Sequence, residues 1–215
     1  MTVTFQLPPP GRLTPNNERD PLPYYYKPLT GWLYRHRLQM GLRLLPDGGR
    51  RVLEVGVGSG ILVPTLTARY PSYLGTDLVL ARDLPALVAP GCQARFQQAD
   101  LLASTGEDAL PADHFDAIVC FSVLEHIADA DGAARGLARA LKPGGTLVTG
   151  YPMVSPLMTR AFAAIGYPNI DEDHVSPPVR IAAALRGVLR RLRRVAFPPA
   201  APTRLALYQC TSWTK

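Results

Sequence analysis

VLEVGVGSG, residues 52–60, runs from a short apolar segment straight into a glycine-rich turn. An apolar segment of this length, followed by glycines and then by ILVPTLTAR (61–69), predicts a buried strand, a tight turn and a helix. In a parallel sheet, ligands bind at the carboxyl ends of the strands, and glycines there let the backbone approach a ligand closely. The spacing is GxGxG, because Ile61 stands where the dinucleotide pattern GxGxxG needs glycine. The turn therefore predicts a ligand site without specifying its ligand.

The rest of the chain alternates between apolar runs of strand length and segments with helical spacing. Such alternation is typical of a Rossmann-like, doubly wound sheet with helices on both faces. Two late strands lie close enough in sequence to form an antiparallel hairpin at the sheet edge. We therefore expect a mostly parallel α/β sheet of about seven strands. The predicted strands are 51–56, 73–77, 94–100, 115–123, 145–151, 190–197 and 204–213, and the predicted helices after the glycine turn are 61–69, 79–88, 131–141 and 177–187.

The first 49 residues have a different character. Residues 1–23 contain six prolines, and because proline fixes φ and removes a donor we expect an extended arm there. Residues 24–45 carry apolar side chains at roughly helical spacing, which predicts a helix that ends before the turn at 46–49. We therefore divide the chain into a proline-rich arm with a helical cap (1–49) and a ligand-binding domain (50–215).

Composition limits the possible classes of protein. The 215 residues are 47% hydrophobic and 19% charged, which suits one globular domain with a small cap. No apolar run approaches the ~18–20 residues of a membrane span, and the N-terminus resembles no secretion signal, so we expect a cytoplasmic protein. Three widely spaced cysteines predict neither a disulfide framework nor a metal clip. Abundant arginine with only three lysines indicates a bacterial source.

Charge is concentrated at the end of the chain. The formal net charge is +6, and residues 178–215 hold eight basic residues and no acidic one. A solvated basic face explains this pattern; an anionic substrate or a membrane surface are the alternatives that stay open. No aromatic residue interrupts the cluster at 186–194, so a base-stacking surface is not indicated and we expect no nucleic-acid partner.

Polar residues follow three further predicted strands. Asp77 ends the second strand, Asp100 ends the third, and Ser122 and His126 follow the fourth. A carboxylate at the end of the second strand can accept hydrogen bonds from both hydroxyls of a ribose, and one at the third can accept from an adenine amino group. An adenosine with an amino-acid tail therefore matches this row of strand ends.

The order of five segments carries a resemblance to a known family: VLEVGVGSG, YLGTD, ADLL, FDAIVCFSVLEHI and LKPGGTLV, all within about residues 50–150. In this order they resemble the class I S-adenosylmethionine-dependent methyltransferases, in particular the small-molecule branch that includes the quinone-biosynthesis enzymes. The resemblance implies S-adenosyl-L-methionine as cofactor and S-adenosyl-L-homocysteine as product. It implies that Gly56, Gly58 and Gly60 line the methionine portion while Glu54 orients the loop, that Asp77 binds the ribose beside Leu78, that Asp100 and Leu101 hold the adenine, and that Phe121 and Ser122 lie beside the sulfonium.

Some of these residues also have structural interpretations. Glu54 could satisfy amides of the loop, Asp100 could cap a helix, since caps favour aspartate, and Asp77 could have a structural role. The functional and the structural interpretation both remain open at this point.

Two histidines are the candidates for catalysis. Methyl transfer needs a base only where the acceptor arrives protonated, and histidine titrates in the useful range. We expect His126, just after the fourth strand, and His174, in a polar loop before a helix, to serve as possible bases. A structural role for His126 stays open. Some relatives place a metal with an ExxEH motif and a later histidine, but Ser122 replaces the first glutamate here, and we predict no metal site.

Aromatic side chains gather in the predicted cap. Five of them fall within residues 24–34. In relatives a helix before the first strand folds over the cofactor and the acceptor, and aromatics there would form an apolar lid. Packing of the helix on the sheet, or contact with a membrane surface, are the alternatives. The predicted acceptor contacts are Tyr25, Tyr26, Trp32 and Tyr151.

We therefore predict a methyltransferase that acts on a small aromatic, phenolic or natural-product-like acceptor, with histidine-assisted deprotonation. A peripheral-membrane enzyme acting on a quinone or lipid is the nearest alternative. A nicotinamide-dependent oxidoreductase is disfavoured by the GxGxG spacing, and a non-catalytic cofactor-binding protein stays open. The sequence leaves the acceptor, the methylated atom and the choice between monomer and homodimer undetermined.

Overall fold

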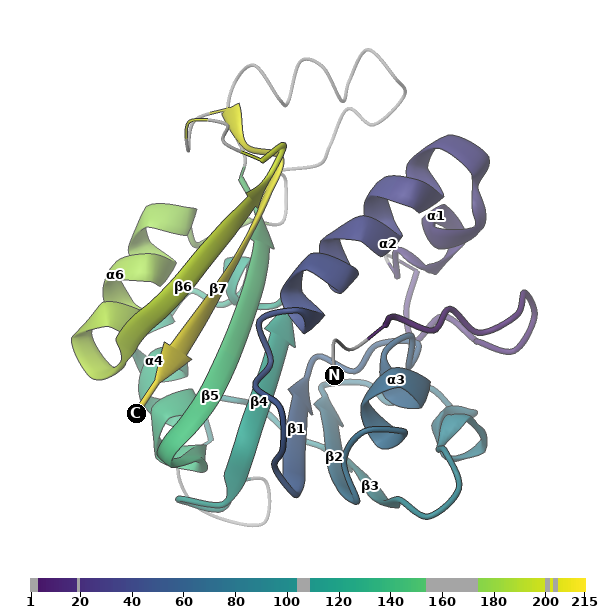
Figure 1. The fold of residues 1–215 in the computed structure, drawn as a ribbon, viewed down its shortest axis with the longest axis horizontal. Helices are drawn as coiled ribbons and strands as arrows, with labels where there is room; N and C mark the ends of the chain where they lie inside the picture. Colours follow the sequence, from purple (N-terminus) through teal and green to yellow (C-terminus); the bar gives the residue numbers. More distant parts are fainter. Residues whose placement is uncertain (1–3, 19, 104–108, 154–173, 200–201, 203–204) are drawn as a thin grey trace.

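A computed structural model of the 215-residue chain describes residues 4–18, 20–103, 109–153, 174–199, 202 and 205–215. Its centre is a seven-stranded sheet of order β3-β2-β1-β4-β5-β7-β6 (Figure 1). The first five strands pair in parallel, and β7 pairs antiparallel with both β5 and β6. This confirms the predicted fold class, including the antiparallel edge hairpin. The strands are β1 Arg51–Val55, β2 Ser72–Asp77, β3 Gln93–Gln98, β4 Phe115–Phe121, β5 Leu141–Pro152, β6 Arg190–Phe197 and β7 Tyr208–Thr214.

Helices pack on both faces of this sheet because the central strands are apolar on both sides. On β4, Ile118 is buried in the cluster under α4 and α6, and its neighbour Val119 is buried in the cluster under α2 and α3. The alternating side chains of one strand thus serve two separate cores. The helices are α1 Leu22–Tyr26, α2 Pro28–Leu42, α3 Val63–Thr67, η1 Leu84–Leu87, η2 Leu124–His126, α4 Ala130–Ala140 and α6 Pro178–Val188.

Four elements differ from the sequence predictions by more than two residues. The single helix predicted over 24–45 is two helices, because Pro28 forces the preceding Lys27 out of the helical region to ψ 143°. Only Leu84–Leu87 of the helix predicted over 79–88 forms, as a 3₁₀ turn. Strand β5 starts before the predicted 145, because Leu141 already pairs with Phe115 ahead of a register shift. The last strand begins at Tyr208 instead of 204.

The proline-rich arm is anchored along its length to the rest of the molecule. The backbone N–H of Gln6 donates to Thr65 Oγ1 at 3.0 Å, on α3. The Tyr26 hydroxyl donates to the carbonyl oxygen of Pro8 at 2.9 Å. Described residues 4–20 contain neither helix nor strand, as the prolines predict, and these contacts hold the arm beside α3 (Figure 1). The predicted arm extended to residue 23, but α1 already begins at Leu22, because proline is tolerated in the first turn of a helix.

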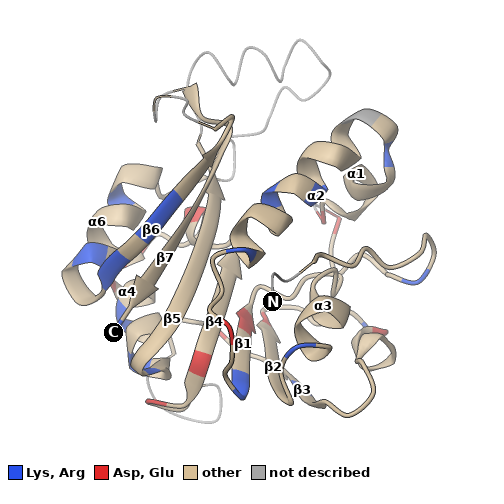
Figure 2. Cartoon of the chain, in the orientation of Figure 1, with Lys and Arg blue, Asp and Glu red and all other residues tan. Residues whose placement is uncertain are grey.

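Charged side chains are distributed unevenly over the fold. In Figure 2 basic residues concentrate on β6 and α6, at the opposite side of the molecule from α1. The arginines of β6 are exposed on the outermost strand of the sheet. In the part of the chain that the structure describes, no helix is both long and apolar enough to cross a membrane.

Candidate active site

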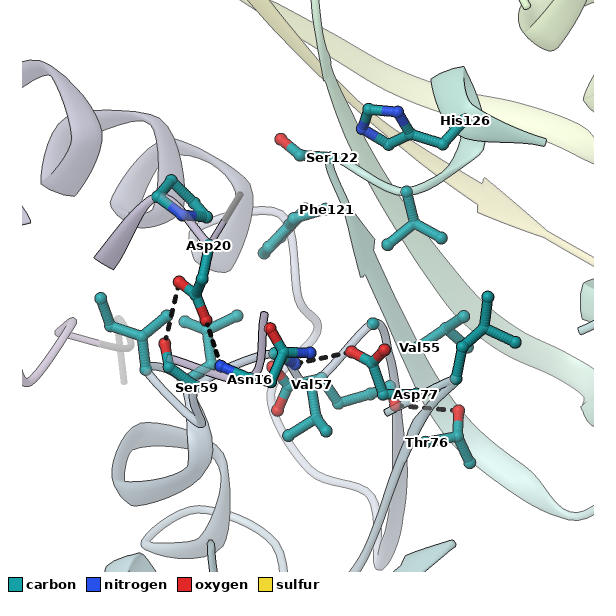
Figure 3. A pocket seen from close by; sticks show the side chains of 18 of the residues that line it. Asn16, Asp20, Val55, Val57, Ser59, Thr76, Asp77, Phe121, Ser122 and His126 are labelled. Carbon is teal, nitrogen blue, oxygen red and sulfur yellow. Dashed lines mark hydrogen bonds between the residues drawn. The ribbon is translucent and has the colours of Figure 1, made fainter. Parts of the chain in front are cut away.

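A cavity of about 870 Å³ opens at the carboxyl ends of the parallel strands. This volume lies within the range of ligand pockets and is large enough for a nucleoside cofactor together with a small second molecule. Its walls come from the segments after β1, β2, β3 and β4, closed on one side by the arm and by α2 (Figure 3). The lining residues that the sequence analysis singled out are Tyr25, Glu54, Gly56, Gly58, Asp77, Leu78, Asp100, Leu101, Phe121, Ser122 and His126.

The glycine turn after β1 requires glycine for two different physical reasons. Gly56 has φ +80°, and a Cβ there would collide with the side chain of Val123. Gly58 has φ +53° and faces open space apart from a carboxylate oxygen of Asp20. Gly60, at φ +84°, packs against Leu84 and is not among the residues that line the cavity. The first two glycines therefore form a wall that a ligand can approach closely, and the third packs the turn onto η1.

Asp77 connects the end of β2 to the glycine turn. Its Oδ2 accepts a hydrogen bond from the Gly58 N–H at 2.8 Å, and its Oδ1 accepts from the Val79 N–H at 3.3 Å. The structural interpretation of Asp77 therefore has direct support. Each carboxylate oxygen can accept further hydrogen bonds, and Asp77 also lines the cavity, so the same group remains available to a ligand.

Glu54 lies one residue before the end of β1 and is 3% exposed. The Tyr73 hydroxyl donates to its Oε2 at 2.5 Å, which differs from the loop-amide contact that the sequence left open. Burial raises the pKa of Glu54 to about 8, while the Tyr73 hydrogen bond acts in the opposite direction. At neutral pH the pair is therefore held largely in its protonated form beneath the glycine turn.

Asp100 follows β3 and begins a turn. Its Oδ1 accepts from the Leu102 N–H at 2.9 Å, and its carbonyl oxygen accepts from the Ala103 N–H. Residues 101–103 do not form a helix, so within the described residues Asp100 closes a turn instead of capping a helix. Asp100 and the buried Leu101 both line the cavity.

The end of β4 is strained. Ser122 adopts φ +56°, a conformation that a residue other than glycine seldom takes. Its backbone N–H donates to the Gly150 carbonyl at 2.7 Å, and its hydroxyl lies 3.0 Å from the hydroxyl of Tyr208 on β7. Strain of this kind is held in place by surrounding contacts and is concentrated at functional sites. The backbone conformation of Ser122 directs Phe121 and Ser122 toward the cavity (Figure 3).

The structure brings both candidate histidines together. The rings of His126, on η2, and His174 lie with centroids 5.2 Å apart. One potential ligand atom from each of Glu125, His126 and His174 lies within 4.8 Å of the others. Glu125 is 2% exposed, neither of its carboxylate oxygens has a hydrogen-bond partner among the described residues, and burial raises its pKa to about 7. These three residues thus form a cluster of potential metal ligands, and the sequence analysis predicted no metal site here.

Several predicted acceptor contacts lie away from the cavity. Trp32 is 53% exposed and stacks on His36, beside Phe197 of β6. Tyr151 is buried in the sheet, where its hydroxyl accepts from Gln209. Five predicted site residues are not among those that line the cavity: Tyr26, Trp32, Gly60, Tyr151 and His174. Residues 171–173 of the polar loop proposed to face the acceptor lie outside the described residues.

Two groups of lining residues were missed by the sequence analysis. One is the arm, which places Asn16 and Asp20 at the cavity. The other is Arg37 of α2, whose Nη2 donates to the Tyr25 hydroxyl at 3.0 Å and whose Nε has no hydrogen-bond partner in the described part of the chain. The guanidinium carbon lies 4.2 Å from the centroid of the Tyr34 ring. Helical spacing in α2 had suggested only that arginines alternate with apolar residues, which does not indicate that one points inward.

A parallel sheet of this order, with a glycine turn after β1 and acidic residues after β2 and β3, defines a nucleoside-binding α/β protein. Residues 33–192 match the family model described as a methyltransferase domain, so the chain belongs to the methyltransferase-domain family. Ubiquinone biosynthesis O-methyltransferase from Ralstonia nicotianae is 30% identical over 160 residues, which is 67% of this chain and 62% of that protein. The protein of the same name from Paracidovorax citrulli is 35% identical over 106 residues, 47% of this chain and 43% of that protein. The chain thus spans less than two thirds of the length of either relative.

The fold also has solved counterparts. The N-methyltransferase NodS from Bradyrhizobium japonicum WM9, crystallised with S-adenosyl-L-homocysteine, superposes with a TM-score of 0.61. It is 18% identical, and the match covers 92% of this chain and 93% of that one. At this identity the likeness concerns the fold.

Proposed function

We propose that this chain transfers a methyl group from S-adenosyl-L-methionine to a hydroxyl of a small aromatic acceptor. The proposal rests on one observation. The ends of β1, β2, β3 and β4 together form one wall of the cavity, which contains the glycine turn, Asp77, Asp100 and Ser122. The family match and the names of the relatives, both O-methyltransferases of ubiquinone biosynthesis, support this reading and favour an oxygen atom as the methyl acceptor.

The cavity suits this cofactor. Asp77 and Asp100 would bind the ribose and the adenine, Gly56 and Gly58 would contact the methionine portion, and Leu101 would cover the adenine. The open space at Gly58, where a side chain would intrude, fits a ligand that passes close to the backbone. When bound, the cofactor supplies an electrophilic methyl group on a sulfonium sulfur. Residues 1–49 would cover this domain, which we propose to extend over 50–215.

The remaining wall would orient the acceptor. Phe121, Val123 and Ile127 present apolar surface beside Ser122 at the end of β4. An aromatic ring held there is kept from water and aligned with the methyl group, which is where most of the rate of such a displacement arises. His126 lies at the same end of the cavity and would accept the proton of the acceptor hydroxyl.

A peripheral-membrane role on a quinone or lipid would bring the basic segment and the aromatic helix to one face. In Figure 2 the basic residues of β6 and α6 lie at the opposite side of the molecule from α1. Trp32 of α2 nevertheless contacts Phe197 at the end of β6, so the preference for a small-molecule acceptor rests on the cavity and the family match rather than on this separation.

The test is a transfer assay with methyl-labelled S-adenosyl-L-methionine and a panel of catechols and phenols. We expect a labelled methyl ether from at least one catechol. We expect His126→Gln to lower kcat at neutral pH by about 100-fold while the affinity for S-adenosyl-L-homocysteine stays unchanged. Cofactor binding without transfer to any acceptor would instead support a non-catalytic cofactor-binding protein. Unchanged turnover in the variant would show that His126 is not the base.

A further inference from the structure

The N-terminal arm crosses the mouth of the cavity at the glycine turn. The Thr14 hydroxyl donates to Asp83 Oδ2 at 2.5 Å, and the Asn16 side-chain amide donates to the carbonyl oxygen of Val79 at 3.0 Å. Both partners belong to the segment that follows β2. Since these side-chain contacts fix the arm to the rim of the cavity, the residues that come next along the arm have defined positions over the turn.

Asp20 is the arm residue that contacts the glycine turn. Its Oδ1 accepts from the Leu22 N–H at 2.8 Å and from the Ser59 hydroxyl at 3.4 Å, and its Oδ2 accepts from the Asn16 N–H at 3.2 Å (Figure 3). A Cβ built on Gly58 would lie 3.9 Å from Oδ2. The carboxylate therefore lies over the Cα of Gly58, at the distance of ordinary contact with a small group.

Gly58 is thus flanked by two carboxylates. Asp77 accepts from its backbone N–H, and Asp20 lies on the side where a Cβ would be. Figure 3 shows the two aspartates approaching the turn from opposite sides. Both line the same cavity.

The two carboxylates differ in what they can still bind. Among the described residues, every hydrogen-bond donor to Asp20 is neutral and no basic side chain forms an ion pair with it. Its negative charge is therefore not neutralised within the described part of the chain. A cationic group of a ligand is the natural partner for a carboxylate in this state, because charge-assisted hydrogen bonds are about twice as strong as neutral ones.

We propose that Asp20 binds the α-ammonium group of S-adenosyl-L-methionine, an assignment that rests on the proposed function. If Asp77 holds the ribose, the amino-acid tail extends past Gly58 toward the arm. The tail ends in an ammonium and a carboxylate, and Asp20 attracts the first and repels the second. The arm thus completes the cofactor site, although it precedes every segment that carries the family resemblance.

The test compares two ligands on three forms of the full chain. The ligands are S-adenosyl-L-homocysteine and its deaminated analogue, in which hydrogen replaces the α-amino group. The forms are the unaltered chain, Asp20→Asn and Asp131→Asn. Asparagine keeps the size of aspartate and an oxygen that can accept from the Leu22 N–H, so the arm retains a contact. Asp131 is exposed in the first turn of α4 and is not among the residues that line the cavity, so its variant makes the same aspartate-to-asparagine change away from the cofactor site.

We expect Asp20→Asn to weaken binding of S-adenosyl-L-homocysteine about tenfold or more by isothermal titration calorimetry, and to leave binding of the deaminated analogue within about twofold. Asp131→Asn should change neither. An equal loss for both ligands would show that Asp20 only folds the arm, and an equal effect of Asp131→Asn would show that general negative charge is responsible. Binding that is unchanged in Asp20→Asn would overturn the assignment and leave the proposed function standing. Failure of the unaltered chain to bind S-adenosyl-L-homocysteine would overturn both.

Discussion

At the scale of single residues, the glycine turn offers the sharpest comparison. Gly56 and Gly91 have nearly the same backbone conformation, with φ +80° and +86°. A Cβ on Gly91 would meet nothing within 4 Å, whereas one on Gly56 would collide with Val123. Alanine substitutions at the two glycines therefore separate the free-energy cost of the left-handed backbone from the cost of steric overlap with Val123.

We expect Gly91→Ala to lower the free energy of unfolding by roughly 1 kcal/mol, the cost of placing alanine in the left-handed region. Gly56→Ala should lower it by about 3 kcal/mol, because the displacement of Val123 is added to the same backbone cost. Urea unfolding of both variants measures the difference. Equal losses would mean that the turn relaxes freely, and that Gly56 is required only for its φ.

At the scale of the element, β1 holds an ionisable pair in the core. Glu54 has its pKa raised by burial to about 8 from an ordinary value of 4.5. A carboxyl group whose pKa is higher in the folded state stabilises the fold fully only below the unfolded pKa, and this contribution is lost as the pH rises through the folded value. As the pH rises from 4.5 to 8, the raised pKa of Glu54 therefore lowers the free energy of unfolding by an increasing amount.

Glu54→Gln keeps an acceptor for Tyr73 but cannot ionise. We expect the variant to gain stability relative to the unaltered chain as the pH rises from 4.5 to 8, by up to roughly 5 kcal/mol. Urea unfolding at pH 5 and pH 8 measures this change in the ligand-free protein. Glu18→Gln, at an exposed position, is the control and should give a constant difference. A constant difference for Glu54→Gln would mean that Glu54 is ionised in the folded state.

The elements also show which features a sequence can predict. The strands were placed to within a few residues because Val52, Ile118 and their neighbours form apolar runs bounded by turn residues. The break between α1 and α2 was missed although Pro28 signals it, because apolar spacing on both sides favoured one continuous helix. Local patterns therefore located the sheet better than the surrounding helices.

The residues of the candidate site were also predicted unevenly. Glycines and aspartates that follow strands were found, since the topology brings strand ends to one edge. Asp20 was missed because the arm has no periodic pattern, and its place over Gly58 depends on contacts with residues more than thirty positions away. Trp32 was expected at the acceptor, but its direction depends on tertiary packing against Phe197, which no local pattern encodes.

At the scale of the whole molecule, β6 is the exposed edge of the sheet. Its arginines 190, 191, 193 and 194 are all exposed, and within the described residues β6 pairs with β7 alone. Unpaired strand edges invite association with a second copy, and charged side chains on an edge oppose it. Protection of this sheet edge thus explains why basic residues are concentrated in this part of the sequence.

Replacing these four arginines by threonine keeps strand propensity and removes the repulsion. We expect the variant to form larger species at concentrations where the unaltered chain does not, as measured by size-exclusion chromatography with light scattering. Replacement of Arg180 and Arg186 on α6 by glutamine is the control, because those side chains are exposed on a helix. The same oligomeric state in both variants would show that the edge is not protected by charge.

The central claim is that the cavity at the strand ends binds S-adenosyl-L-methionine, and thermal unfolding with S-adenosyl-L-homocysteine tests it most directly. At about 100 times the dissociation constant, the ligand should stabilise the fold by ~2.7 kcal/mol and raise Tm by about 5 °C or more. Asp77→Ala, with affinity reduced by about 2 kcal/mol, should show roughly one third of that stabilisation at the same concentration. NAD should produce no shift. A shift with NAD and none with S-adenosyl-L-homocysteine would contradict the account.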